Sequence, residues 1–203
     1  MVMGFDKLEI GGGFNPSSGY LQVDMDASCQ PDIVGDIRAI FTPDLKLEDF
    51  EQLQPLADYS NPMFEAVKCN HFIEHVQWLY QEAMFQWFYA ILHPNGVLEL
   101  ETPDLMWITK SYLKNKKKKK FPLQDHPNLN KPEHFEPWVN FKLYSGCSLG
   151  DYHHCMYDKE YLIYQLNKVG FKSKVTSRGG YLKALAVKTV AKGQGSNDEW
   201  FSG

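Results

Sequence analysis

Glycines and carboxylates recur where the first apolar segments of the chain end. Three glycines, Gly11–Gly13, follow the apolar residues 7–10, and Asp24 and Asp36 follow the next two apolar segments. Because glycine has no Cβ atom, its backbone can turn sharply and approach a ligand closely. A carboxylate after the second strand can accept hydrogen bonds from both hydroxyls of a ribose, and a later one can reach a base. This pattern predicts a pocket for a nucleotide-type cofactor.

A His-x-x-Glu-His segment, His71 to His75, follows a short apolar strand expected at residues 66–69. Imidazole titrates near neutral pH, so His71 or His75 can serve as a catalytic base. Inverted zinc peptidases carry the same spacing, with two histidines one helical turn apart on zinc and a glutamate that activates water. We favour a role without metal because the motif follows the carboxyl end of a strand, and a zinc hydrolase stays the less favoured alternative.

Strand and helix patterns alternate along the chain, which is typical of an α/β fold. We expect strands at residues 7–10, 20–24, 32–35, 66–69, 96–101, 172–177 and 184–190, and helices at residues 44–58, 75–92, 104–115 and 158–169. The middle strands read as apolar on both faces, as in a sheet covered by helices on both sides. Only residues 14–19 separate the glycines from the second strand, too few for a crossover helix, so we expect a shortened loop there.

The motifs, taken in order, resemble class I S-adenosylmethionine-dependent methyltransferases, and in particular their small type-11-like group. The resemblance rests on Glu9-x-Gly11-x-Gly13, Asp24, Asp36, residues 70–75 (NHFIEH), residues 92–96 (LHPNG) and residues 102–104 (TPD), and it spans residues 7–190. It implies a three-layer α-β-α Rossmann-like sandwich around a mostly parallel seven-stranded sheet with an antiparallel last strand. It also implies methyl transfer from S-adenosyl-L-methionine to an O, N or C atom of a small-molecule or glycan-type acceptor.

The resemblance assigns roles to individual residues. The cofactor-binding residues that it implies are Glu9, Gly11, Gly12, Gly13, Asp24, Asp36, Ile37, Asn70 and His71, with Asp26 as the substitute for Asp24 if the strand ends later. The candidate catalytic residues are His71, His75, His153 and His154. The candidate acceptor-side residues are Trp107, Tyr144 and Tyr157, within an insertion at residues 104–157 that also holds Trp138. Asp158 is expected to cap the helix that follows this insertion.

Composition limits the remaining possibilities. A chain of 203 residues suits one domain, which we expect at residues 1–192, followed by a flexible tail at residues 193–203. The net charge of -4 makes nucleic acid an unlikely partner, and the basic run Lys114 to Lys120 reads as a solvated loop. Four cysteines without a Cys-x-x-Cys pair, the lack of a secretory leader and the lack of a long apolar run indicate a cytoplasmic protein with reduced thiols and no membrane segment. The oligomeric state stays open.

Two further readings compete with a methyltransferase. A nicotinamide dinucleotide oxidoreductase also uses a glycine turn and an acid after the second strand. Here Pro16 stands where such enzymes need a third small residue, and residues 14–19 leave no room for the helix. A non-catalytic S-adenosylmethionine-binding partner or regulatory domain would keep the same acids without turnover.

Overall fold

The computed structural model describes residues 4–43, 45–46, 51–57, 62–115, 143–144 and 152–189. Its strands are β1 (Lys7–Ile10), β2 (Leu21–Asp24), β3 (Ile33–Val34), β4 (Phe64–Asn70), β5 (Leu92–Pro103), β6 (Phe171–Arg178) and β7 (Tyr181–Lys188). Its α-helices are α1 (Gln54–Ala57), α2 (Gln81–Ile91), α3 (Leu105–Asn115) and α5 (Lys159–Lys168), and 3-10 turns are η1 (Ala27–Cys29), η2 (Ile37–Ile40), η4 (Ile73–His75) and η5 (Trp78–Tyr80). The expected tail, Trp138 and most of the insertion and of the lysine run lie outside the described residues.

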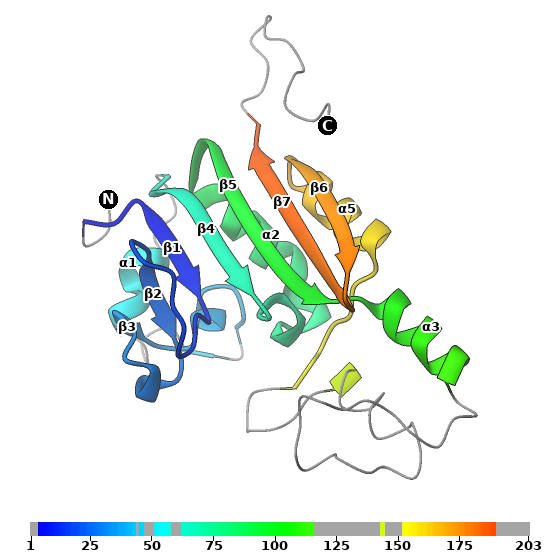
Figure 1. Cartoon of the computed structure of the whole chain (residues 1–203). Coiled ribbons are helices and arrows are strands. Elements are labelled where there is room, and N and C mark those ends of the chain that lie inside the picture. Colours follow the sequence, from blue (N-terminus) through cyan, green and yellow to red (C-terminus); the bar gives the residue numbers. More distant parts are fainter. Residues whose placement is uncertain are drawn as a thin grey trace, which may run out of the picture.

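All the strands belong to one sheet in the order β3-β2-β1-β4-β5-β7-β6. Neighbouring strands are parallel from β3 to β5, and β7 runs antiparallel to both β5 and β6. The seven-stranded, mostly parallel sheet with an antiparallel last strand is therefore confirmed. The parallel strands point downward in Figure 1, so their carboxyl ends share the lower edge of the sheet.

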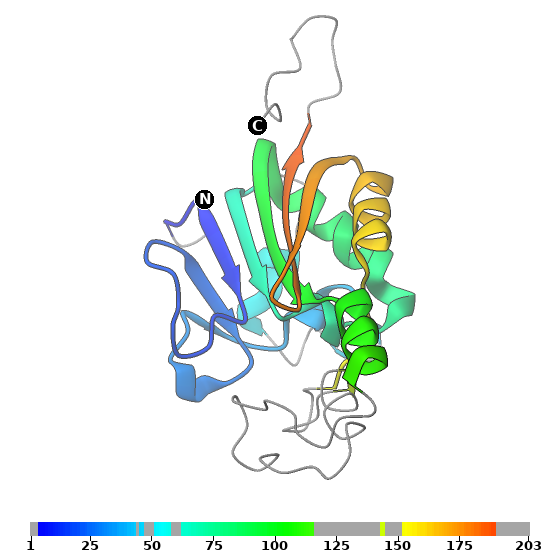
Figure 2. The same ribbon diagram turned by 45° about the vertical axis from the view of Figure 1, so that its right-hand side comes forward.

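The two faces of the sheet differ in chemistry. On one face, Leu8, Val67 and Leu98 lie in one cross-strand row and are fully buried. Helices α1, α2 and α5 cover this face, whereas α3 extends away from the end of β5 (Figures 1 and 2). Burial of these aliphatic side chains is the main favourable contribution to the stability of such a layer.

The opposite face carries charged side chains in register. Lys68 lies between Glu9 and Glu99, and Lys183 lies opposite Glu101 with 2.5 Å between its Nζ and a carboxylate oxygen. No helix covers this face in the part of the chain that the structure describes (Figure 2). The described residues thus form two layers, where the resemblance implied three, and the central strands are polar on one face because that face meets solvent.

The helix expected at residues 75–92 begins later than the pattern suggested. The α-helix α2 starts at Gln81, after two short 3-10 turns. The buried amide of Gln81 donates to the carbonyl oxygens of Ile73 and Val76, with distances of 2.9 and 2.7 Å. Because a side chain satisfies these carbonyls, the backbone need not continue as an α-helix there.

Other expected elements differ mainly in length. Of the helix expected at residues 44–58, the described residues show α1, and β5 extends well beyond the expected residues 96–101. The connection between β1 and β2 contains no helix, as its length predicted. Asp158 caps α5 as predicted, because its carboxylate accepts a 2.8 Å hydrogen bond from the backbone N–H of Tyr161.

Among the described residues, no helix combines the length and the apolar character needed to cross a membrane.

Candidate functional site

A cavity of about 520 Å³ lies at the carboxyl ends of β1, β2, β3 and β4. The residues that line it are Ile10, Gly11, Val23, Asp24, Met25, Asp26, Gly35, Asp36, Ile37, Arg38, His71, Phe72 and His75. Parallel strands present their ligands at this edge because the loops that leave their carboxyl ends converge there. The cavity therefore brings together Gly11, Asp24, Asp36, Ile37, His71 and His75 from the predicted site.

The glycine turn positions the carboxylate of Asp24. Gly11 has a φ of 68° and Gly13 has a φ of 56°. Residues other than glycine rarely adopt these backbone conformations. The N–H of Gly13 and the N–H of Asp26 donate to the two carboxylate oxygens of Asp24, at 3.1 and 2.9 Å. Asp24 is thus held at the cavity wall with lone pairs remaining on both oxygens.

Glu9 braces the glycine turn from the charged face of the sheet. Its carboxylate accepts hydrogen bonds from the backbone of Ser17 at 2.5 Å and from the amide of Gln22 at 3.0 Å, and Nζ of Lys68 lies 2.9 Å away. Burial by itself raises the pKa of Glu9, but these partners together hold that pKa below its usual value. Glu9 does not line the cavity, so its place in the structure is that of a support for the turn.

Close packing behind the turn leaves little room for a side chain at Gly12. A Cβ atom on Gly12 would lie 2.7 Å from the side-chain oxygen of Gln22 and 3.3 Å from the carboxylate of Glu9. Like Gly13, Gly12 does not line the cavity. The three glycines therefore have different tasks, and Gly11 is the one that faces the cavity.

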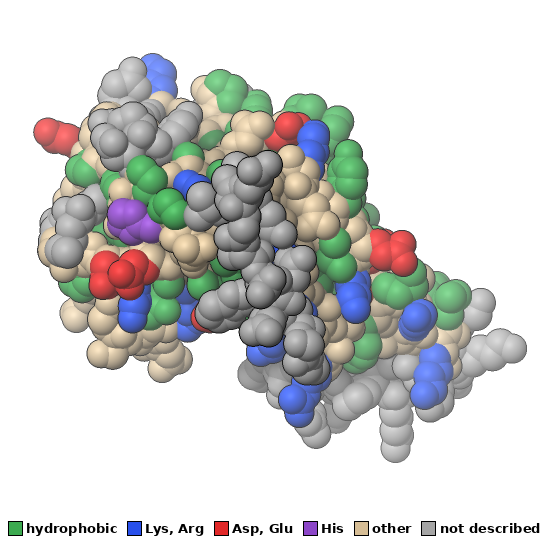
Figure 3. All heavy atoms as spheres, turned by 90° about the horizontal axis from the view of Figure 1, so that it is seen from above, with side chains coloured by type: hydrophobic (Ala, Val, Ile, Leu, Met, Phe, Trp, Pro, Cys, Tyr) green, Lys and Arg blue, Asp and Glu red, His purple; other side chains and the backbone are tan. Residues whose placement is uncertain are grey.

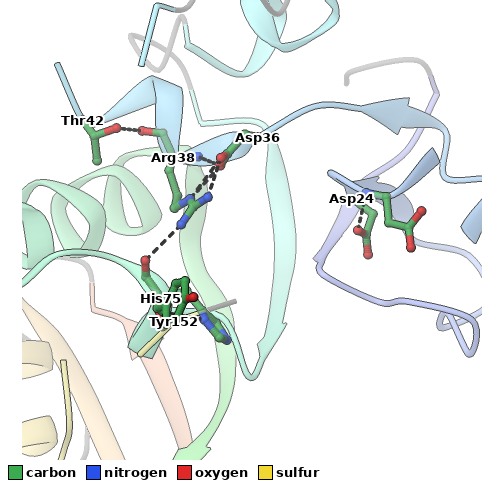
Figure 4. A network of polar contacts seen from close by, with 7 residues as sticks. Asp24, Asp36, Arg38, Thr42, His75 and Tyr152 are labelled. Carbon is green, nitrogen blue, oxygen red and sulfur yellow. Dashed lines mark hydrogen bonds and ion pairs between the residues drawn. The ribbon is translucent and has the colours of Figure 1, made fainter. Parts of the chain in front are cut away.

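Asp36 and Arg38 form an ion pair in the cavity wall that the sequence did not suggest. Three nitrogen atoms of Arg38, including Nη2 at 2.6 Å, donate to the carboxylate of Asp36, and Nη1 donates to the carbonyl oxygen of His75 at 3.2 Å (Figure 4). Thr42 donates in turn to the carbonyl oxygen of Arg38 at 2.8 Å. The signal that could have found Arg38 is the Asp-x-Arg spacing. When an aspartate caps a short turn, a cationic side chain two residues later can pair with its carboxylate.

His71 stands at the end of β4 in an unusual backbone conformation. Its φ is 52°, and its ring lies 3.4 Å from the carboxylate of Glu74 through Nδ1 and 3.2 Å from that of Glu101 through Nε2. Its contact with the carboxylate of Glu74 and the nearby charge of Glu101 raise the pKa of His71, against the opposing effect of burial. A 3.4 Å contact is long for a hydrogen bond, so the ion pair is the better description of the contact with Glu74.

The second histidine-rich segment lies directly beside the end of β4. Nδ1 of His75 is 3.2 Å from the carbonyl oxygen of Tyr152 (Figure 4), and the rings of His75 and His153 have centroids 4.9 Å apart. The backbone N–H of His154 donates to the carbonyl oxygen of Glu74 at 2.7 Å. Burial lowers the pKa of His154. The structure thus brings together the predicted histidines from two segments that are far apart in sequence.

The predicted acceptor-side aromatics do not meet at the cavity. Trp107 packs against Gly180 beyond the sheet edge, and Tyr144 is exposed. Tyr157 is fully buried, stacks on Tyr161 and donates its hydroxyl to the side chain of Gln81. The structure therefore puts Tyr157 in the core, where an acceptor does not reach its ring, because α2 and α5 close over it.

Asn70 also lies away from the cavity. It borders a shallow hollow on the charged face of the sheet, together with Lys68, Glu101 and Lys183. The neighbouring His71 lines the cavity instead, because successive residues at the end of a strand point to opposite faces.

Solved structures of methyltransferases share this fold. The DhpI-SAM-HEP complex matches 91% of this chain and 80% of its own, with a TM-score of 0.53 and 15% identity. A SAM-dependent methyltransferase from Thermotoga maritima, described as a possible histamine N-methyltransferase, matches 90% of this chain and 81% of its own, with a TM-score of 0.52 and 15% identity.

An O-methyltransferase family protein from Burkholderia thailandensis matches with a TM-score of 0.50 and 9% identity. It covers 92% of this chain, and the match spans 51% of that protein's length. A comparison with curated proteins found no significant match.

The model of a methyltransferase domain family matches residues 20–175, which is more than half of the chain. The match includes Asp24, Asp36, the His71–His75 segment and the segment that carries His153. The chain therefore belongs to this methyltransferase domain family.

Proposed function

We propose that this chain binds S-adenosyl-L-methionine in the cavity and transfers its methyl group to a small-molecule or glycan-type acceptor. The observation that carries the proposal is the carboxylate of Asp24, which the glycine turn holds at the cavity wall. A carboxylate at the end of the second strand is placed to accept hydrogen bonds from both ribose hydroxyls.

The residues around the cavity fit such a cofactor. The volume of about 520 Å³ lies within the roughly 300–1,000 Å³ that is usual for small-molecule sites. A Cβ atom built on Gly11 would meet nothing within 4 Å, so open space adjoins the backbone there. Asp24 would hold the ribose, Asp36 and the backbone of Ile37 would hold the adenine, and Gly11 would let the methionine portion approach.

Methyl transfer asks little of the protein beyond alignment and exclusion of water. When bound, S-adenosyl-L-methionine supplies a methyl group on a positively charged sulfur, which is an excellent leaving group because it departs as a neutral thioether. Phe72 and His71 line the side of the cavity that faces the end of β4. Phe72 excludes water there, and Glu74 and Glu101 fix the ring of His71 on this side of the cavity.

A binding experiment tests the cofactor. The tag-free chain is titrated by calorimetry with S-adenosylhomocysteine, and the Asp24→Asn variant is compared with Asp6→Asn, a control outside the cavity. A hydrogen bond to a charged group contributes roughly 1.5–3 kcal/mol, so Asp24→Asn should weaken binding about 10–100-fold while Asp6→Asn leaves it unchanged. No binding by the unchanged chain, or equal binding by both variants, contradicts the proposal.

Turnover is tested separately from binding. The chain is incubated with S-adenosyl-L-methionine and panels of hydroxyl, amine and activated-carbon acceptors, including glycans, and S-adenosylhomocysteine is measured. Acceptor-dependent product supports the enzyme. Asp24-dependent binding without product from any acceptor favours the non-catalytic partner domain instead.

A further inference from the structure

Three potential metal ligands from distant parts of the sequence converge beside the cavity. Glu74 and His75 follow β4, His153 precedes α5, and one ligand atom from each lies within 4.8 Å of the other two. We propose that Glu74, His75 and His153 form a binding site for a divalent transition-metal ion, with zinc as its expected occupant. Two imidazoles and one carboxylate are a ligand set that zinc commonly takes, with a fourth position left for water or substrate.

Glu74 shows the need for a cation most directly. Its side chain is fully buried, and Oε2 accepts a 3.0 Å hydrogen bond from the hydroxyl of Thr102. Among the described residues, Oε1 accepts no hydrogen bond, and Nδ1 of His71 lies 3.4 Å from it. A buried carboxylate oxygen without a donor is costly, and coordination of a cation is one of the ways in which proteins compensate it.

The hydrogen bond of His75 prepares its ring for coordination. A carbonyl oxygen can only accept, so Nδ1 of His75 carries the hydrogen that is donated to Tyr152 at 3.2 Å. In the neutral form of this ring, the lone pair is on Nε2. Metal-bound histidines commonly donate their other ring N–H to a backbone carbonyl in this way, which fixes both the tautomer and the orientation of the ring.

The backbone holds the two ligand segments together without any metal. The N–H groups of His154 and Cys155 both donate to the carbonyl oxygen of Glu74, at 2.7 and 3.1 Å, and the N–H of His153 donates to the carbonyl oxygen of Tyr144 at 3.0 Å. These bonds set His153 opposite His75 before an ion arrives. A site that is largely formed in advance loses little conformational entropy on binding.

The geometry requires a small contraction. With bonds of roughly 2.0–2.1 Å, ligand atoms around tetrahedral zinc are about 3.4 Å apart, so ligand atoms that are up to 4.8 Å apart must approach by at most about 1.4 Å. Half-buried His75 and His153 can make this movement through their side-chain torsions. The nearby guanidinium of Arg38 is paired with the carboxylate of Asp36, which offsets its charge.

This site is not the zinc site of the inverted peptidases. That site needs two histidines one turn apart on an α-helix. Here η4 is a 3-10 turn, and His71 has a positive φ and turns toward Glu101 instead. The second imidazole comes from His153, which the His-x-x-Glu-His spacing does not include.

The test is a zinc titration of the tag-free, chelator-stripped full chain. Calorimetry and elemental analysis should show one equivalent of zinc. His153→Ala should weaken binding by more than the roughly 10–100-fold that loss of an outer-shell partner costs. Two matched controls, His154→Ala next to the site and His93→Ala at the start of β5, should leave the affinity unchanged. His93 is the second residue of β5 and lies at the amino ends of the parallel strands. Figure 3 shows the molecule from this end.

The outcomes separate this proposal from the proposed function. Thermal unfolding checks that each variant folds, and zinc should raise the melting temperature of the unchanged chain but not that of His153→Ala. Cobalt in place of zinc should give visible absorption bands typical of four ligands, which His153→Ala should lose. Absence of saturable zinc binding, or equal binding by His153→Ala and His154→Ala, overturns the site. Titration with S-adenosylhomocysteine is unaffected by that failure, because Asp24 lies outside the ligand set.

Discussion

Nη1 of Arg38 donates a hydrogen bond to the carbonyl oxygen of His75 at 3.2 Å, although the two residues belong to different walls of the cavity. The same guanidinium holds the carboxylate of Asp36. One side chain therefore joins the part of the wall that follows β3 to the part that follows β4, and it fixes the width of the cavity between them.

Replacing Arg38 with alanine should impair both binding and stability. It leaves Asp36 half-buried without its cation and the carbonyl of His75 without a donor, which should cost about 1–3 kcal/mol of unfolding free energy. The affinity for S-adenosylhomocysteine should fall about tenfold, because Asp36 is no longer held. Calorimetry and urea unfolding measure the two effects, and Arg178→Ala at the exposed end of β6 is the control. Unchanged affinity in Arg38→Ala would show that the bridge has no part in cofactor binding.

Glu9 should make the stability of the chain depend on pH. Its pKa in the folded chain lies below the ordinary value of 4.5, so its stabilising contribution is complete above that value and is lost as the pH falls through the lower, folded value. The unfolding free energy should therefore decrease between about pH 5 and about pH 3, and Glu9→Gln should flatten this decrease. Urea unfolding across that range measures it. Glu99→Gln, on the exposed sheet face, should keep the slope, and an equal slope in Glu9→Gln would contradict the prediction.

Gly12 and Gln22 should be energetically coupled. Gly12→Ala places a Cβ atom 2.7 Å from the side-chain oxygen of Gln22, so we expect a loss of about 1–3 kcal/mol in unfolding free energy. In the double variant with Gln22→Ala the 2.7 Å contact disappears, and the cost should be about 0.5–3 kcal/mol less than the sum of the single changes. Urea unfolding of all four chains gives the coupling. Combining Gly12→Ala with the distant Gln86→Ala should give additive costs, and additivity with Gln22→Ala as well would refute the packing argument.

Gln81 should be among the most sensitive polar residues of the core. Its side chain satisfies the carbonyls of Ile73 and Val76 and the hydroxyl of Tyr157, all away from water. Gln81→Leu should cost about 3 kcal/mol, since each buried polar group left without a partner costs about 1–3 kcal/mol and some can relax.

Gln86→Leu on the exposed side of the same helix is the matched control for this change and should cost less than about 0.5 kcal/mol. Thermal and urea unfolding compare the two variants. Similar stabilities for Gln81→Leu and Gln86→Leu would mean that the bonds of Gln81 contribute little.

The cavity residues that sequence could predict are those fixed by the ends of strands. Asp24 and Asp36 could be placed because the carboxyl ends of parallel strands meet at one edge of a sheet. Arg38 could not, because its contact depends on the turn η2 bending the chain back on itself. Tyr157 was expected beside an acceptor, but its burial depends on packing against Phe85 and Gln81, contacts that no local pattern encodes.

The charged sheet face could have been predicted and was not. β4 alternates Val67, Lys68, Cys69 and Asn70, a period of two that is typical of a strand with one solvated face. We expected apolar side chains on both faces because short strands in α/β proteins usually lie between two helical layers. The missing crossover helix after β1 carried the same information, since a shortened connection leaves one face without its cover.

The unequal faces of the sheet also determine how its strands align during folding. A shift of β4 by one residue against β1 would turn Lys68 into the core and Val67 out into water, and it would separate Lys68 from Glu9. A sheet that is equally apolar on both faces has no such penalty, because either alignment buries similar side chains. The face that lacks a helical layer thus encodes the pairing of the strands, and with it the alignment of the strand ends from which the cavity is built.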